Sequence, residues 1–211
     1  MIKISLKGLA KFMTSDAAGQ RKVLRDYKYP DPEGRAQATY YREARDFITV
    51  FHRDDHDRKW LVEKADLLYD LAYAATGQTK ARLMHNARAL LQYEEHFGNK
   101  SYEILGDLKL NIAQSDVRVT VYPDLYVEEN GLRKIVKLEF SSDPPKPTVV
   151  KIISQCMYEA AQNSGLKIAA SQVLYLDVPR GKLHKGARVR ARMRKNIEAA
   201  CQNIKAIWDS I

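Results

Sequence analysis

Residues 122–140 read YPDLYVEENGLRKIVKLEF, and this stretch decides how the second half of the chain is interpreted. Apolar and polar side chains alternate on both sides of Asn130-Gly131, a dipeptide that is the strongest short signal for a β-hairpin. The alternation puts Asp124 on the polar face of the strand before the turn, and Lys137 and Glu139 on the polar face of the strand after it. We therefore expect two carboxylates and a lysine to converge on the side of the hairpin that faces away from the core.

Two carboxylates beside a lysine are the groups that metal-dependent phosphodiester hydrolysis requires. The oxygens of Asp124 and Glu139 are hard ligands of the kind that Mg²⁺ or Mn²⁺ prefers. A bound metal lowers the pKa of its water and neutralises charge on the phosphate. Lys137 would orient the attacking water or stabilise the developing negative charge. The alternative interpretation of these three residues is a solvated strand face or an ion pair across the sheet.

The segments around the hairpin indicate an α/β protein. Apolar residues recur at helical spacing up to Gly98, and the period then changes from 3.6 to 2. The expected fold is a mixed four-stranded sheet flanked by helices (an α-β-β-β-α-β core) with a helical N-terminal region. The two parts are residues 1–78 and residues 79–211. The expected helices are 15–27, 36–51, 59–75, 79–97, 148–164 and 187–211, with one more before Met13, and the expected strands are 102–112, 116–127, 134–140 and 171–178.

The hairpin motif and this order of elements resemble the PD-(D/E)XK nuclease superfamily, in its RecB-like branch. The resemblance covers about half of the chain, residues 79–178. It implies that Asp124 and Glu139 hold Mg²⁺ or Mn²⁺ and that Lys137 faces the phosphate or the water. In this branch the helix after the third strand carries a Gln and a Tyr that support the site, and the comparable residues here are Gln155 and Tyr158.

The chain departs from the family motif in ways that bear on activity. The family has an acidic residue, any residue and then Lys on the third strand, whereas this chain has Lys137-Leu138-Glu139 with the two charges exchanged. Two strand residues span about 6.6 Å, so the exchange moves the carboxylate by that distance relative to Asp124. The spacing of Gln155 and Tyr158 is also one residue shorter than in the branch. The site is thus expected to be either a rearranged active site or a degenerate one. An acidic residue of the preceding helix, Glu94 or Glu95, is a weaker candidate.

The charge of the chain favours a polyanionic partner. Lys and Arg number 35 against 26 Asp and Glu, which gives a formal net charge of +9. The stretch 180–195 is the densest basic run and holds no acidic residue. A solvated loop and helix face is the alternative for this run. The residues expected to contact phosphates are Lys182, Lys185, Arg188, Arg190, Arg192 and Arg194.

Other features exclude some classes of protein. No apolar run reaches ~18 residues, and Lys7 and Lys11 interrupt the N-terminal apolar residues, so we expect neither a membrane span nor a secretory signal. The two cysteines, Cys156 and Cys201, predict buried free thiols and a cytoplasmic protein. Three functions stay open: a metal-dependent nuclease acting on DNA rather than RNA, a degenerate nuclease-like subunit that binds nucleic acid or a protein partner, and a protein-binding module.

Overall fold

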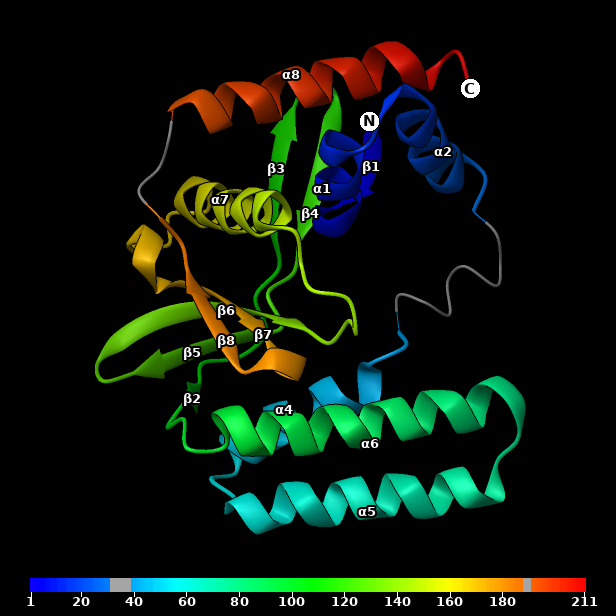
Figure 1. Ribbon diagram of the computed structural model, residues 1–211. Helices are drawn as coiled ribbons and strands as arrows, with labels where there is room; N and C mark the ends of the chain where they lie inside the picture. The colour runs from blue at the N-terminus through cyan, green and yellow to red at the C-terminus, as the bar shows by residue number, and fades with distance from the viewer. Residues whose placement is uncertain (31–38, 188–190) are drawn as a thin grey trace.

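The computed structural model describes residues 1–30, 39–187 and 191–211 (Figure 1). Over these residues the chain is a mixed α/β protein with seven α-helices and two mixed β-sheets. The α/β class is therefore confirmed, but the expected single four-stranded sheet is not. Among the helices so described, none is both long and apolar enough to cross a membrane.

The β-structure forms one sheet of three strands and one of five. The three-stranded sheet has the order β1-β4-β3, and the five-stranded sheet has the order β2-β5-β6-β7-β8. Figure 1 shows β3 and β4 at a steep angle to β5 and β6. The strands are β1 (Ile2–Ser5), β2 (Glu103–Ile104), β3 (Leu110–Gln114), β4 (Val117–Val121), β5 (Leu125–Glu129), β6 (Leu132–Glu139), β7 (Val173–Asp177) and β8 (Lys182–Lys185).

The four-stranded expectation is wrong because two of the expected strands are each divided between the sheets. The expected strand 102–112 is interrupted between β2 and β3, where Gly106 has φ +117°. The expected strand 116–127 is interrupted between β4 and β5 at Pro123, which has no N–H to give to a strand ladder. Each division changes the direction of the chain and starts a second sheet.

The strand β1 has no counterpart in the sequence prediction, which expected only helix before Met13. It pairs in parallel with β4, from Ile2 opposite Val117 to Ser5 opposite Thr120. Helix α1 (Leu6–Thr14) follows directly, and the Ser5 side chain caps it by accepting from the Gly8 N–H. The first residues of the chain thus lie against the strands that lead into the hairpin.

The hairpin between β5 and β6 is confirmed. The two strands are antiparallel with Leu125 opposite Val136 and Glu129 opposite Leu132, which leaves a two-residue loop. Asn130 and Gly131 both have positive φ, at 55° and 71°, as a type I′ turn requires.

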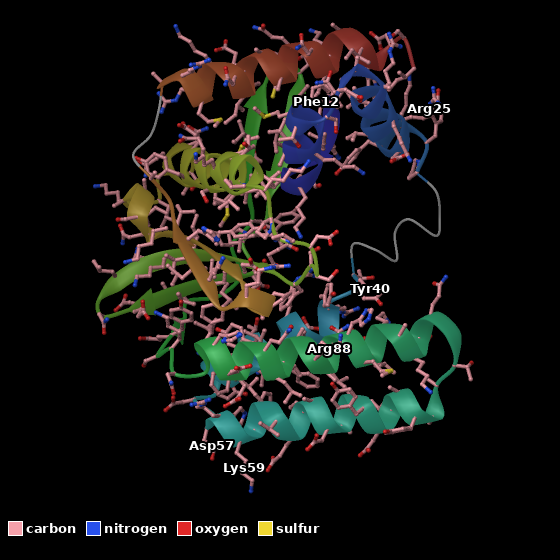
Figure 2. All side chains as sticks on the ribbon, viewed as in Figure 1. Phe12, Arg25, Tyr40, Asp57, Lys59 and Arg88 are labelled. Atoms are coloured by element: carbon pink, nitrogen blue, oxygen red, sulfur yellow. The ribbon has the colours of Figure 1, made fainter. Side chains whose placement is uncertain are left out.

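Helices cover both faces of the five-stranded sheet. Helices α4 (Arg42–Arg53), α5 (Arg58–Ala74) and α6 (Gly77–Phe97) lie on one side, and the other side is covered by α1, α7 (Pro147–Asn163) and the three-stranded sheet (Figure 1). The outermost elements of that second side are α2 (Ala17–Lys28) and α8 (Ala191–Trp208). Phe12 of α1 and Lys59 of α5 mark the two sides in Figure 2.

Each face of the five-stranded sheet borders its own apolar core. Val136 and Leu138 of β6 join the core made with α4, α5 and α6, whereas Ile135 joins the core made with α1, α7 and α8. Lys137 and Glu139 alternate with Val136 and Leu138, so they share the face of Ile135. The polar residues of the motif therefore lie beside an apolar core and not on an outer surface of the molecule.

Candidate functional site

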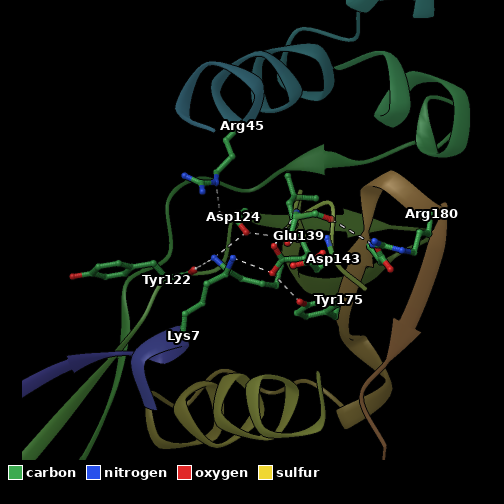
Figure 3. A network of polar contacts seen from close by, with 12 residues as sticks. Lys7, Arg45, Tyr122, Asp124, Glu139, Asp143, Tyr175 and Arg180 are labelled. Atoms are coloured by element: carbon green, nitrogen blue, oxygen red, sulfur yellow. Dashed lines mark hydrogen bonds and ion pairs between the residues drawn. The ribbon is translucent and has the colours of Figure 1, made fainter. Parts of the chain in front are cut away.

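The structure brings Asp124, Lys137 and Glu139 together, as the sequence predicts. Asp124 directly precedes β5, and its backbone N–H donates to the carbonyl of Val136 at 2.8 Å. Lys137 and Glu139 lie near the end of β6. The neighbouring strand β7 places Tyr175 opposite Lys137. Figure 3 shows these groups gathered between α1, α4 and the sheet.

Asp124 is bound by two cations and one backbone donor. Its carboxylate accepts from the Leu138 N–H at 2.7 Å. Lys137 Nζ lies 2.9 Å from Oδ2, and Arg45 Nε of α4 lies 3.3 Å from Oδ1. Only 7 % of the Asp124 side chain is exposed, so water can offer it little further solvation. Lys137 also donates to the carbonyl of Tyr122 at 3.3 Å, which fixes its ammonium group beside Asp124.

Glu139 is bound by a different cation, which comes from the start of the chain. Lys7 Nζ of α1 lies 2.9 Å from Oε2, the Tyr175 hydroxyl donates to the same oxygen at 2.9 Å, and the Ser141 N–H donates to Oε1 at 3.2 Å. Burial alone would raise the pKa of Glu139, but Lys7 and the two hydrogen-bond donors hold it below its usual value. Burial and the nearby Glu139 charge raise the pKa of Tyr175. Glu139 is therefore ionised and Tyr175 neutral near pH 7.

This arrangement does not fit a divalent cation. The oxygens that would bind a metal are already paired with the cations Lys7, Lys137 and Arg45. A metal would have to approach three positive charges and displace at least one of them. In the described part of the chain, moreover, no three His, Cys, Asp or Glu residues are grouped so that they could hold a metal. Mg²⁺ and Mn²⁺ stay predictions of the sequence that these contacts do not support.

A cavity of about 300 Å³ lies beside Glu139, between α1, α4 and the end of β6. Tyr41 stacks on Phe140 with 5.0 Å between ring centroids, and the Tyr40 hydroxyl bonds to His85 Nδ1 at 2.7 Å. Burial, Tyr40 and the charge of Glu139 raise the pKa of Tyr41, so the Tyr41 hydroxyl is neutral near pH 7. We call the cavity between α1, α4 and the end of β6 the front cavity. Its lining residues are Lys7, Tyr40, Tyr41, Arg45, Glu139, Phe140, Ser141 and Ser142.

Arg45 has unused hydrogen-bonding capacity at the front cavity. Its Nε faces Asp124, but among the described residues it forms no well-directed hydrogen bond. Within the same residues, none accepts a hydrogen bond from either terminal nitrogen of the guanidinium group. Arg45 thus keeps donors for a ligand in addition to its ion pair.

Gln155 and Tyr158 of α7 lie elsewhere. Gln155 Nε2 donates to Glu159 at 2.8 Å. Within the described ranges, no hydrogen bond joins Gln155 or Tyr158 to Asp124, Lys137 or Glu139. Both residues line a different cavity, between α7 and β8. The supporting role that the resemblance implies stays a prediction without a contact to carry it.

The acidic candidates of α6 are also engaged away from the site. Glu94 accepts from Arg58 at 2.6 Å, and Glu95 lies 3.9 Å from His96. Both contacts lie within α5 and α6, and among the described residues neither glutamate has a hydrogen bond or ion pair with a residue of the site.

The basic run is distributed over two elements. Lys182 and Lys185 lie on the edge strand β8 and are exposed. Arg192 lies on the exposed surface of α8. Arg194, also on α8, forms an ion pair with Glu159 at 2.9 Å. Arg188 and Arg190 fall outside the described residues. In the part of the chain that the structure describes, the run thus places exposed basic side chains on both β8 and α8.

Two residues of the site, Lys7 and Tyr175, were not identified from the sequence. Arg45 belongs to the stretch 40–45, for which the sequence favours packing against the core over contact with bases or phosphate. Tyr175 could have been found, because it alternates with Leu174 and Leu176 on a strand that the sequence predicts. Lys7 and Arg45 have no such signal, since they reach the site only through the packing of α1 and α4.

Comparisons with known proteins do not assign the chain to a family. No protein-family model matches the chain, and no curated protein matches it. The contacts of the site are therefore the basis on which a function is proposed.

Proposed function

We propose that the chain binds the phosphate backbone of nucleic acid at the front cavity and does not cleave it. The observation that carries the proposal is that both carboxylates of the motif are paired with cations of the chain itself. Lys137 and Arg45 are paired with Asp124, and Lys7 is paired with Glu139. In this view lysine and arginine side chains supply the positive charge that a metal supplies in a nuclease.

The charges at the site favour an anion. Three cations face two carboxylates, which leaves 3 − 2 = +1 before any ligand arrives. A site of this kind attracts a phosphate, and the unused donors of Arg45 match two phosphate oxygens in a fork-like geometry. The net charge of +9 extends the attraction beyond the cavity.

The aromatic residues of the front cavity favour a nucleic acid over a free inorganic anion. Tyr40 and Tyr41 contact each other edge to face, with ring centroids 5.2 Å apart. Bases stack on such rings at about 1–3 kcal/mol per base in proteins that bind single strands. We therefore expect single-stranded nucleic acid to bind more tightly than a duplex, with DNA the first substrate to examine. The buried free thiols of Cys156 and Cys201 agree with the cytoplasmic location that forms part of this proposal.

Metal-dependent hydrolysis is the second candidate, and one observation favours it. The Lys7 side chain is 52 % exposed, so it can leave Glu139 at a smaller cost than a buried cation could. Its departure would free one carboxylate oxygen. A protein partner that binds the same face is a further alternative, and it predicts weak nucleic-acid binding without steep salt dependence.

The test combines binding and cleavage in one set of samples. The purified protein is incubated with single- and double-stranded DNA and RNA in EDTA, Mg²⁺ or Mn²⁺, and products are separated on a denaturing gel. Binding of the same oligonucleotides is measured by fluorescence anisotropy. Two variants accompany the parent: Asp124→Ala/Glu139→Ala and Lys7→Gln/Arg45→Gln.

The proposal expects no cleavage and equal binding in EDTA and in Mg²⁺. It also expects Lys7→Gln/Arg45→Gln to weaken binding about tenfold or more, since two charge-assisted contacts are lost. Metal-dependent cleavage that disappears in Asp124→Ala/Glu139→Ala would overturn it in favour of hydrolysis. Absence of binding to all four substrates would leave the protein-partner alternative.

A further inference from the structure

A second cavity, of about 260 Å³, lies between α7 and β8 and shares no residue with the front cavity. We call it the α7–β8 cavity. Apolar side chains form much of its wall, among them Pro145, Val150 and Met193. Its volume is slightly below the ~300 Å³ at which pockets for small molecules usually begin, so it suits a compact ligand.

One polar side chain in this wall is held in a fixed orientation. Gln155 is 8 % exposed, and its Nε2 donates to Glu159 Oε1 at 2.8 Å. The same oxygen accepts from Arg194 Nε and Nη2, at 3.1 and 2.9 Å, so the acceptor is itself fixed. Because Nε2 donates to Glu159, the amide oxygen of Gln155 is the atom of this side chain that remains to accept a hydrogen bond from a ligand. Among the described residues, none donates a hydrogen bond to that oxygen.

Two further hydroxyl groups and two cations complete the cavity. Ser154 and Tyr158 line it, and within the described part of the chain neither hydroxyl has a hydrogen-bond partner. Lys151 and Lys185 line it from opposite elements, α7 and β8. No carboxylate is among the lining residues that the structure describes. The α7–β8 cavity thus combines apolar walls, a fixed acceptor and positive charge.

We propose that the α7–β8 cavity binds a mononucleotide whose base carries an exocyclic amino group. The base lies between the apolar walls, and its amino group donates to the amide oxygen of Gln155. The phosphate is bound by Lys151 and Lys185, with Ser154 or Tyr158 as hydroxyl donors. The nucleotide is either free or the terminal unit of a strand, since the chemistry that the cavity recognises is the same. This site is separate from the proposed function, because none of Lys7, Arg45 and Asp124 takes part.

The cavity gives a specific preference among nucleotides. AMP and CMP present an amino group at the base edge, whereas IMP and UMP present a carbonyl oxygen, which would face the oxygen of Gln155. Two acceptors that face each other without a proton leave a buried polar group unpaired, which is disfavoured. We expect AMP to bind at least about tenfold more tightly than IMP, corresponding to ~1.4 kcal/mol.

Titration calorimetry with AMP, CMP, IMP and UMP tests the proposal on the full chain, and a 5′-phosphorylated oligonucleotide distinguishes a terminal from a free nucleotide. The variants are Gln155→Met, which keeps the volume and removes the acceptor, and Lys151→Ala/Lys185→Ala, which removes the cations. Lys59→Ala is the matched control, because Lys59 is an exposed lysine at the start of α5, on the opposite side of the molecule (Figure 2).

The expected result is AMP binding that Lys151→Ala/Lys185→Ala weakens about tenfold or more and that Lys59→Ala leaves unchanged. Gln155→Met should remove the preference of AMP over IMP. Thermal unfolding shows whether Gln155→Met is folded. If it is not, Lys151→Ala/Lys185→Ala decides the outcome, because both lysines are exposed and their replacement should leave the fold intact. No binding of any nucleotide at millimolar concentration, or binding that no variant in the cavity alters, overturns the proposal. Retention of AMP binding in Lys7→Gln/Arg45→Gln is required if the two sites are separate.

Discussion

At the scale of single residues, the ion pairs decide which chemistry the site can perform. A carboxylate that lies beside an apolar core needs compensation by cations or several donors, because burial disfavours its charge. Glu139 has both, in Lys7 and in the donors Tyr175 and Ser141. Since these groups occupy its oxygens, the same contacts that keep Glu139 charged also keep a metal away.

Replacement of Lys7 by Met is expected to lower the stability of the protein at neutral pH and to reduce the part of that stability that is lost in acid. The folded-state pKa of Glu139 lies below its usual 4.5, so its stabilising contribution is present above that pH and is lost as the pH falls through the folded pKa. Without Lys7 the folded pKa rises toward or above 4.5, so less of this contribution remains to be lost, and the stabilities of the variant and the parent converge as the pH falls below 4.5. At pH 7 we expect a cost of about 1 kcal/mol, less than for a fully buried pair because Lys7 is half exposed.

Urea unfolding of Lys7→Met at pH values from 3 to 7 measures this effect. Lys11→Met is the control, because Lys11 is an exposed lysine of the same helix. If the two variants have the same pH profile, the Lys7–Glu139 pair does not stabilise the fold.

A buried histidine in the α4–α6 layer gives a second pH-dependent effect. His52 bonds through Nε2 to the Tyr93 hydroxyl at 2.7 Å, and the rings of Phe51 and Tyr102 also contact it. Burial lowers its pKa from 6.5 to about 4, although the charge of Glu129 acts in the opposite direction. The folded protein therefore holds His52 neutral.

The stability associated with His52 is fully present above pH 6.5 and is lost as the pH falls from 6.5 to about 4. The shift corresponds to about 3 kcal/mol over that interval. His52→Gln removes the titration and keeps a polar group beside Tyr93. We expect the free energy of unfolding of His52→Gln to vary less with pH between 6.5 and 4 than that of the parent, and an unchanged slope would contradict the assignment.

At the scale of elements, the position of α1 determines whether Lys7 reaches Glu139. The helix is held at its start by Ser5, whose hydroxyl bonds to the Tyr27 hydroxyl of α2 at 2.5 Å. Gly8 lies directly against the Tyr27 ring, and an added Cβ would overlap the ring atoms. A small residue at position 8 is therefore required for α1 and α2 to approach each other.

Gly8→Ala is expected to destabilise the protein by about 1–3 kcal/mol, as overpacking of a tight contact does. The Tyr27 ring must move, and the Ser5 cap would move with it. The measurement is urea unfolding of Gly8→Ala, of Tyr27→Phe and of the double variant. Because the Tyr27 hydroxyl is the atom nearest to the added Cβ, Tyr27→Phe should recover part of the loss, and strictly additive effects would argue against the overlap.

The elements also show how far sequence reasoning extends. The predicted helices 59–75 and 148–164 agree closely with α5 (Arg58–Ala74) and α7 (Pro147–Asn163), because helical periodicity and helix ends are local signals. The hairpin was predicted because Asn130-Gly131 itself specifies the turn. β1 and the division of strands between two sheets were not, since they depend on pairing between distant segments.

The same limit applies to the site. Asp124, Lys137 and Glu139 converge as predicted, because strand alternation and the hairpin register fix them. Their chemistry could not be predicted in the same way, since Lys7 and Arg45 come from helices far away in the sequence. Their arrival changes the candidate from two open metal ligands to two ion-paired carboxylates.

At the scale of the whole molecule, the five-stranded sheet joins two cores. Its alternate residues pack against α4–α6 on one face and against α1, α7 and α8 on the other. The front cavity lies where the two helical layers approach each other, with Lys7 from one and Arg45 from the other. A ligand in this cavity would contact both layers, so we expect binding to stabilise the molecule as a unit.

The net charge of +9 alone predicts some binding to any nucleic acid, so the location of the contacts must be separated from total charge. For single strands, log Kd rises with log salt concentration by about 0.7 per phosphate contact. Lys7→Gln/Arg45→Gln and Lys182→Gln/Arg192→Gln each remove two positive charges, so both variants have the same net charge. The first pair lies at the front cavity, and the second lies on β8 and α8.

If the front cavity binds phosphates, Lys7→Gln/Arg45→Gln should lower the salt slope by about 1.4, and Lys182→Gln/Arg192→Gln should lower it by less. Fluorescence anisotropy of single-stranded DNA between 50 and 300 mM NaCl, at roughly five salt concentrations, provides both slopes. A larger loss in the second variant would move the contact surface to the basic run that the sequence singles out. Equal small losses would mean that the attraction comes from the charge of the molecule as a whole, because a localised contact cannot be removed equally from two separate surfaces.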